Sequence, residues 1–354
     1  MFPVEFLAPS GLGLEVEPRK ISSSLKKLWE QGEGVVTRAS LINLAIYSEE
    51  PSSLDHNSEI AAEITQDHSC RVILVERDLQ ESHPDAKAWI TAHCHVSGAG
   101  GKQVCCEQVA YRISSDGHSL LANTVLGSLD SDLPLVLWWQ PDFPEAVSGQ
   151  LWSRVDRLIF DSKHWTRVPE QFRAMKEIQA TGPKHVTFCD INWGRLLALR
   201  LALAQLHDHP GASSALFGLQ KLEIHHGKQG RLCAAMLAGW FCRQLGWKME
   251  GTRDQPRLAD PETGAICEIL YHLTEEENGV SKVRGEGGYT FSVEVNENRD
   301  LVLGQVHLAD GHRFQFTAPR SRQETATLVS QELERGSEHR IYPEILEIVS
   351  PLFA

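Results

Sequence analysis

Apolar residues occur along this chain in continuous runs and in alternating stretches, and each pattern predicts a kind of strand. Residues 135–139, with the sequence LVLWW, form a continuous apolar run between Pro134 and Pro141, which is typical of a buried strand. The pattern predicts further strands at residues 41–47, 71–75, 88–96, 103–113 and 157–160, and helices at residues 21–31, 53–68, 119–129 and 145–155. Because strands and helices alternate, we expect βαβ units. Residues 1–180 are therefore predicted to form a mixed α/β sheet domain, with an antiparallel hairpin at one side.

The second half of the chain has a different pattern. Apolar stretches at residues 195–206 and 230–245 predict helices on either side of a strand at residues 221–225. Strand-like runs follow at residues 266–273, 289–295, 301–308 and 313–317, and two closing helices near residues 323–335 and 342–352. Short turn-rich links between neighbouring runs are typical of an antiparallel meander. We therefore expect residues 181–354 to form an α+β domain with flanking helices.

Composition narrows the possible partners. The chain has 354 residues, 47 acidic and 34 basic, which gives a formal net charge of −13. Nucleic acids and anionic membrane surfaces attract concentrated positive charge, so we expect neither as a partner. The N-terminal sequence does not resemble a signal peptide and no apolar run is long enough to span a membrane. With eight cysteines, this pattern predicts a cytoplasmic protein whose thiols are buried or redox-active.

Two glycine-containing segments invite comparison with nucleotide-binding loops. The segment at residues 98–102 ends in Gly101-Lys102, but Val96 stands where a phosphate-binding loop needs glycine and Gln103 where it needs serine or threonine. We interpret it as a hairpin turn. Gly11 and Gly13 lack the third glycine of a dinucleotide fingerprint. We therefore expect no cofactor site.

The predicted hairpin brings cysteines and histidines together. If its turn is symmetric, Cys94 lies opposite Cys105, and His93, His95 and Cys106 share one face. The facing cysteines are at the separation of a cross-strand disulfide, and we treat them as a candidate redox pair, although we favour two buried thiols. The three residues on the other face could ligate a metal, but we favour a role in the core or at the sheet edge.

Polar and aromatic residues suggest a partner interface. Trp138 and Trp139 are adjacent in a strand and so point to opposite faces, and we expect one in the core and the other exposed as a contact. Asp190 and Asn192, followed by Trp193, could begin a helix or anchor a partner. The sixteen histidines, His225 among them, include candidate general bases, but no nucleophile signature accompanies them. We predict no catalytic residue and no metal centre.

Several of these segments together resemble a known family. The sequence from Asp132 to Trp139, DLPLVLWW, is followed by DRLIFDS at residues 156–162 and DINWGRL at residues 190–196, and AHCH and CCEQ precede it at residues 92–95 and 105–108. In this order they are similar to motifs of the glucose-6-phosphate dehydrogenase assembly protein family, OpcA. The resemblance covers about residues 40–200.

The resemblance implies a non-catalytic role. Such proteins bind glucose-6-phosphate dehydrogenase, promote its active oligomer and raise its activity at the entry to the oxidative pentose phosphate pathway, with thioredoxin-dependent control in phototrophs. The family offers no catalytic residues to carry over. The alternative is an α/β enzyme or binding protein for a sugar phosphate, with a cleft lined by Arg157, Arg195 and Arg200.

Overall fold

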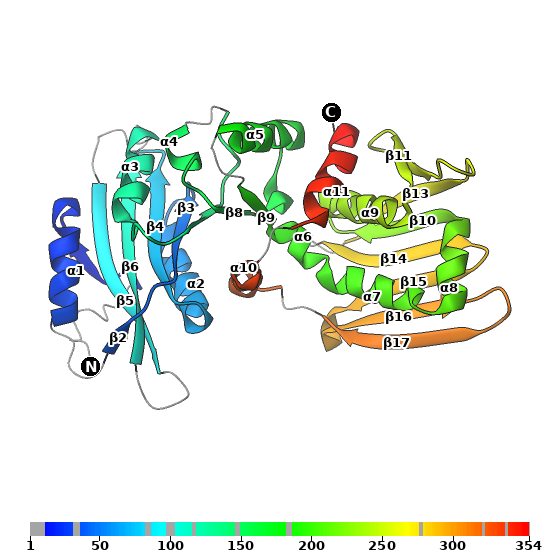
Figure 1. Ribbon diagram of the computed structural model, residues 1–354, viewed down its shortest axis with the longest axis horizontal. Helices are drawn as coiled ribbons and strands as arrows, with labels where there is room; N and C mark the ends of the chain where they lie inside the picture. Colours follow the sequence, from blue (N-terminus) through cyan, green and yellow to red (C-terminus); the bar gives the residue numbers. More distant parts are fainter. Residues whose placement is uncertain are drawn as a thin grey trace. The chain divides into compact units, whose positions relative to one another are not determined.

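The computed structural model in Figure 1 shows two compact units that the chain enters more than once. It describes residues 11–30, 36–81, 86–96, 103–114, 118–145, 149–181, 186–275, 279–320, 323–336 and 339–353. The first unit contains residues 1–160, 173–189 and 324–338, and the second contains residues 161–172, 190–323 and 339–354. The division therefore differs from a single boundary at residue 180, because a late segment returns to the first unit. The predicted hairpin turn at residues 97–102 lies outside the described residues.

The sheet of the first unit has nine strands in the order β1-β5-β6-β4-β3-β7-β8-β9, and β2 also pairs with β6. The pairs from β6 to β8 are parallel, whereas β1, β5 and β6 pair antiparallel. The predicted hairpin beside a parallel sheet is therefore confirmed. The strands are β1 (Leu14–Val16), β2 (Val36–Arg38), β3 (Ile42–Ser48), β4 (Cys70–Asp78), β5 (Ala86–Val96), β6 (Gln103–Ser114), β7 (Leu135–Trp139), β8 (Arg157–Phe160) and β9 (Thr187–Asp190).

Helices cover both faces of this sheet. On one face, Trp29 of α1 (Ile21–Glu30) donates to Glu107, and Ser128 of α3 (His118–Ser128) hydrogen-bonds Tyr111. On the other face, α2 (Ser53–Asp67) contacts β4 and β5, and α10 (Thr325–Glu334) packs on α2. The described part of the predicted helix at residues 145–155 is one turn, α4 (Gly149–Trp152). Helix α5 (Val168–Thr181) begins in the second unit and ends in the first.

The sheet of the second unit has eight strands in the order β11-β12-β13-β10-β14-β15-β16-β17. Strands β14 to β17 form an antiparallel meander, in which β15, β16 and β17 were predicted and β14 was not; the other predicted run, β13, instead pairs parallel with β10. The strands are β10 (Leu219–His226), β11 (Lys248–Gly251), β12 (Pro256–Ala259), β13 (Ile266–Leu273), β14 (Val280–Gly287), β15 (Thr290–Asn296), β16 (Leu301–His307) and β17 (Arg313–Pro319).

Two long helices support this sheet from one side. Helix α7 (Leu197–His207) contacts β15, β16 and β17, and α9 (Arg231–Leu245) contacts β10 and β11. Helix α11 (Ile341–Val349) packs on α9, while α6 (Ile191–Arg195) and α8 (Pro210–Ala215) are short. The closing helix predicted near residues 323–335 exists as α10, but its assignment to the second domain is wrong because it belongs to the first unit.

The mixed α/β fold class is confirmed by the two sheets with their helices. Within the described ranges, every helix is too short or too polar to cross a membrane.

Candidate functional site: the outer face of the second sheet

Neither tryptophan of β7 is exposed. Trp138 and Trp139 each have 4% of their surface accessible. The ring centroid of Trp139 lies 4.2 Å from that of Tyr47 and 5.0 Å from that of Trp152, and its Nε1 donates to the carbonyl of Asp142. The expectation that one of the pair is exposed is wrong, because β7 is an interior strand between β3 and β8 and all five of its residues are buried.

The DINW segment is also interior. Asp190 caps α6 by accepting a hydrogen bond from the backbone N–H of Asn192 at 2.9 Å, so the helix-entry interpretation is confirmed. Its carboxylate also accepts hydrogen bonds from the backbone N–H and hydroxyl of Ser162, and from the hydroxyl of Tyr342 at 3.0 Å. Burial raises the pKa of Asp190 to about 6. Asp190, Asn192 and Trp193 are each at most 2% exposed, which removes them as surface contacts for a partner.

The three arginines of the expected sugar-phosphate cleft each have protein partners. Arg195 makes two hydrogen bonds of 2.7 Å to Asp161. Burial would raise the pKa of Asp161, but the guanidinium outweighs it and holds that pKa below its usual value. Arg200 stacks over Trp193 with Cζ 3.6 Å from the ring centroid. Arg157 belongs to the other unit, where it donates to the carbonyl of Glu332. Each of the three guanidinium groups therefore contacts residues of its own unit.

The candidate redox pair is a disulfide. Cys94 and Cys105 face each other across β5 and β6, as the symmetric turn predicts, and their sulfurs are bonded. The preference for two free thiols is therefore wrong. Cys105 is fully buried against Leu28 of α1, whereas Cys94 is partly exposed, so a reductant would reach the bond through Cys94.

The two histidines beside this pair, His93 and His95, form hydrogen bonds with residues of the first unit. Nε2 of His93 hydrogen-bonds Gln108 at 2.8 Å, and Nε2 of His95 hydrogen-bonds Thr65 of α2 at 3.1 Å. Burial lowers the pKa of His93. With Cys106 they do not form one of the close ligand clusters found among the described residues.

The second sheet presents an outer face, opposite α7 and α9, with polar side chains in register. We define the outer face by the outward-pointing residues of β10 and of β13 to β17. Three cross-strand rows follow from the pairing. They are His272-His225-Lys282-Glu294-Leu303-Thr317, Leu270-Glu223-Arg284-Ser292-Gln305-Gln315, and Glu268-Lys221-Glu286-Thr290-His307-Arg313.

Charges alternate on the outer face and pair with one another. Lys282 lies 2.9 Å from Glu294, and Arg284 lies 2.5 Å from Glu286. On β13, Leu270 is 37% exposed. This mixture of paired charges and scattered apolar side chains is what the rim of a protein–protein interface contains.

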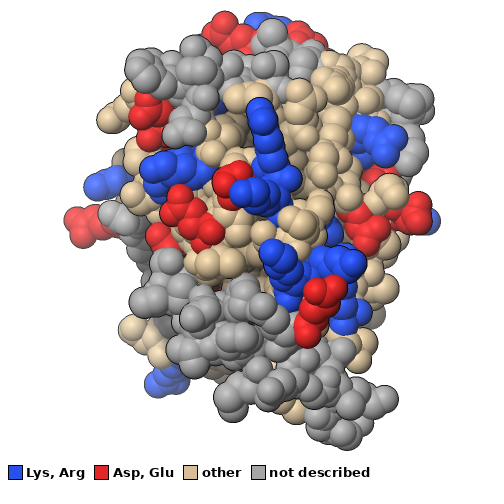
Figure 2. All heavy atoms as spheres, turned by 90° about the vertical axis from the view of Figure 1, so that its left-hand side faces the viewer, with Lys and Arg blue, Asp and Glu red and all other residues tan. Residues whose placement is uncertain are grey.

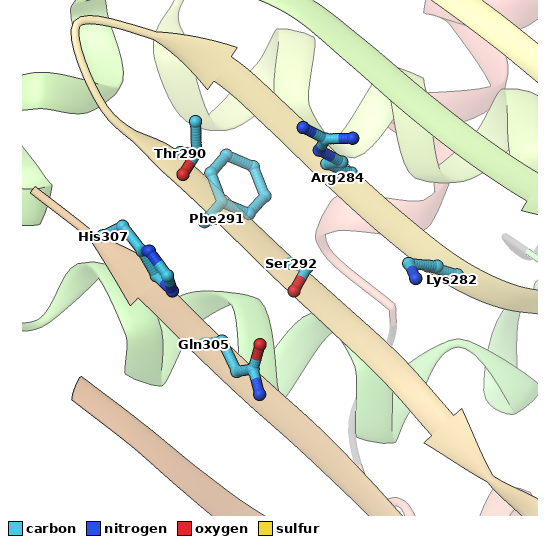
Figure 3. Close-up of a pocket in the computed structure, with 7 residues that line it drawn as sticks. All are labelled: Lys282, Arg284, Thr290, Phe291, Ser292, Gln305 and His307. Carbon is cyan, nitrogen blue, oxygen red and sulfur yellow. The ribbon is translucent and has the colours of Figure 1, made fainter. Parts of the chain in front are cut away.

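A shallow pocket of about 220 Å³ lies on this face. Figure 3 shows that its lining side chains come from three adjacent strands. They are Lys282 and Arg284 of β14, Thr290, Phe291 and Ser292 of β15, and Gln305 and His307 of β16. Two cations, two hydroxyls and an amide give the pocket the donors that bind a carboxylate or another polar group of a partner.

Sequence reasoning missed the outer face because it missed β14. In residues 280–287, Lys282, Arg284 and Glu286 alternate with Val283 and Gly285. That period of two was the signal available for a strand exposed on one side.

The first unit has a surface of mixed charge. Figure 2 shows one face on which Lys and Arg side chains are interspersed with Asp and Glu side chains. The salt bridges of the first unit include Lys26 with Glu30 and Arg77 with Glu49. The first unit therefore has basic side chains that are paired with acidic ones.

Sequence comparison matches both halves of the chain to one protein. Residues 61–177 match the family described as the glucose-6-phosphate dehydrogenase subunit N-terminal domain, and residues 186–346 match the C-terminal domain of that subunit. A curated protein of Synechococcus elongatus, whose name describes it as a candidate OxPP cycle protein OpcA, is 25% identical over 315 residues. That alignment covers 81% of this chain and 68% of the relative.

Solved structures give weaker similarities. A 3-ketoreductase from Actinomadura kijaniata is 12% identical with a TM-score of 0.47, over 88% of this chain and 95% of that one. An oxidoreductase from Sinorhizobium meliloti is 10% identical with a TM-score of 0.46, over 88% of each chain.

Proposed function

The chain belongs to the family of the glucose-6-phosphate dehydrogenase subunit OpcA, and on that premise we propose that it is a non-catalytic assembly factor and allosteric activator of this dehydrogenase. The observation that carries the proposal is the match of residues 61–177 and 186–346 to successive domains of one dehydrogenase subunit. The chain has a role in the oxidative pentose phosphate pathway.

We propose the outer face as the surface that contacts the dehydrogenase. It combines the exposed Leu270 of β13 with paired charges such as Arg284 with Glu286. A charge pair at an interface sets partner choice and orientation more than raw affinity. A partner that offers complementary charges to these rows would therefore be held in one orientation.

Activation by contact requires that the chain bind one state of the enzyme better than another. A coupling free energy of about 1–3 kcal/mol changes apparent substrate affinity by roughly 5- to 150-fold. The same coupling acts in reverse, so substrate should tighten the binding of this chain to the dehydrogenase by an equal factor.

The test uses the purified full-length chain and the dehydrogenase of the same organism. Sedimentation velocity measures the complex, and initial rates below saturation measure the apparent affinity for glucose 6-phosphate. We expect a larger dehydrogenase species and a lower apparent KM. If the chain at micromolar concentration neither sediments with the enzyme nor changes its kinetics, the proposed function is wrong.

Two charge reversals locate the contact. Arg284→Glu places a second carboxylate beside Glu286 on the outer face, and should weaken binding. Arg243→Glu is the matched control, because Arg243 is also half-exposed and ion-paired, with Glu344, but lies on α9 on the other side of the sheet. If Arg284→Glu binds the dehydrogenase as tightly as Arg243→Glu does, the contact does not lie on the outer face.

We also propose that the Cys94–Cys105 disulfide responds to redox state, with thioredoxin as its reductant. The partial exposure of Cys94 supports this role, since a dithiol reductant must reach one sulfur of the bond. Dehydrogenase activation is compared before and after reduction, with the Cys94→Ala, Cys105→Ala variant as a control. An equal response to reductant in that variant would assign the redox response elsewhere.

A further inference from the structure

Two histidines and a glutamate meet on the outer face, where β10 and β13 run side by side. His225 lies directly opposite His272 in the parallel register, and the ring centroids are 4.6 Å apart. Glu223 precedes His225 by two residues and so points from the same face. One ligand atom from each of the three lies within 4.8 Å of the other two.

The surroundings of His272 also point to a ligand. Among the described residues, Nε2 of His272 is buried and has no hydrogen-bond partner. An unsatisfied buried nitrogen is costly unless something binds it.

We propose that Glu223, His225 and His272 bind a divalent transition-metal ion of the Zn²⁺ class. Two imidazoles and one carboxylate are a common ligand set for zinc, and three protein ligands leave a fourth position for water. The site is formed by two neighbouring strands whose register fixes the spacing, so binding requires side-chain adjustment only. The proposal does not rest on the role at the dehydrogenase, because it concerns the isolated chain.

Three cations surround the site and limit its affinity. Lys282 and Arg284 lie opposite His225 and Glu223 on β14, but each is paired with a glutamate of its own. Lys221 differs, since its Nζ lies 2.5 Å from Oε1 of Glu223. It therefore competes with the metal for the carboxylate, and its removal should strengthen binding.

Calorimetric titration of the full-length chain with Zn²⁺, and the visible spectrum with Co²⁺, test the site. His272→Gln and Glu223→Gln should each weaken binding by roughly tenfold or more. His307→Gln is the matched control, because His307 lies on the same face but outside the cluster, and it should bind as the unmodified chain does.

Lys221→Gln keeps the test informative if a ligand variant folds poorly. This substitution should tighten Zn²⁺ binding and increase the visible absorption of bound Co²⁺. A misfolded chain would show neither change. Unchanged affinity in both His272→Gln and Lys221→Gln would overturn the proposal. Because no dehydrogenase is present, that result would leave the proposed function untouched.

Discussion

The buried carboxyl of Asp190 should make the stability of the second unit depend on pH. Burial raises its pKa to about 6, against 3.8 for an ordinary aspartate, so the folded chain holds the proton more tightly than the unfolded chain. Its contribution to stability is therefore complete below pH 3.8 and is lost as the pH rises to 6. At about 1.4 kcal/mol per pKa unit, the loss amounts to about 3 kcal/mol.

Asp190→Asn removes the titration with little change of shape. The amide oxygen can still accept from the backbone N–H groups of Ser162 and Asn192, and the amide nitrogen can donate to the hydroxyl oxygens of Ser162 and Tyr342. The unfolding free energy of the variant should rise relative to the unmodified chain by about 2 kcal/mol between pH 4 and pH 7. Other titrating groups are common to both proteins and cancel in this difference.

Urea unfolding at four pH values between 4 and 7, followed by tryptophan fluorescence, measures the difference. The ring centroids of Trp193 and Tyr342 are 5.9 Å apart, so the fluorescence of Trp193 reports on this region. Asp260→Asn is a control of opposite sign, because hydrogen bonds from Thr263 and from a backbone N–H lower the pKa of the exposed Asp260. A difference for Asp190→Asn that stays constant with pH would refute the reasoning.

Three other perturbations test the packing. Trp139→Ala should cost about 3–5 kcal/mol in thermal or urea unfolding, because the ring is buried; a stable variant that only loses partner binding would contradict this. Gly285→Ala should cost about 1–3 kcal/mol because a Cβ there meets an aromatic ring, whereas Gly288→Ala, with open space around it, should cost little in the same assay. Reduction of Cys94–Cys105 should lower the unfolding free energy by about 3 kcal/mol, from the entropy of the loop it closes, and alkylation in denaturant should label two more cysteines after reduction than before.

The parts of the fold that local patterns determine could be predicted from the sequence. Strand β7 occupies the predicted residues 135–139, because an apolar run between two prolines can only be a short interior strand. The facing positions of Cys94 and Cys105 followed from the symmetry of one hairpin. Both predictions depend on residues close in sequence, where strand geometry leaves few alternatives.

Predictions that depend on distant contacts were wrong or absent. Alternation places Trp138 and Trp139 on opposite faces, but it does not say whether each face is covered, and here both are. Residues 280–287 contain two glycines and three charged residues, a composition of loops. The ring of Phe291, one strand away, lies against Gly285 and fills the space a side chain would occupy, which is why the segment is a strand.

The difference between local patterns and distant contacts also explains why the proposed contact surface is the part hardest to predict from the sequence. Burial requires an apolar residue at an interior position, and such residues recur along the sequence with the period of the strand or helix. A position on the outer face is filled by ion pairs such as Lys282 with Glu294, and a solvated strand of any protein has residues of that kind. Only the register of six strands aligns them in rows, and that register joins residues far apart in the sequence, such as His225 with His272 and with Lys282. Substitutions that alter one row while leaving the buried side intact are therefore the perturbations that can separate contact with a partner from folding.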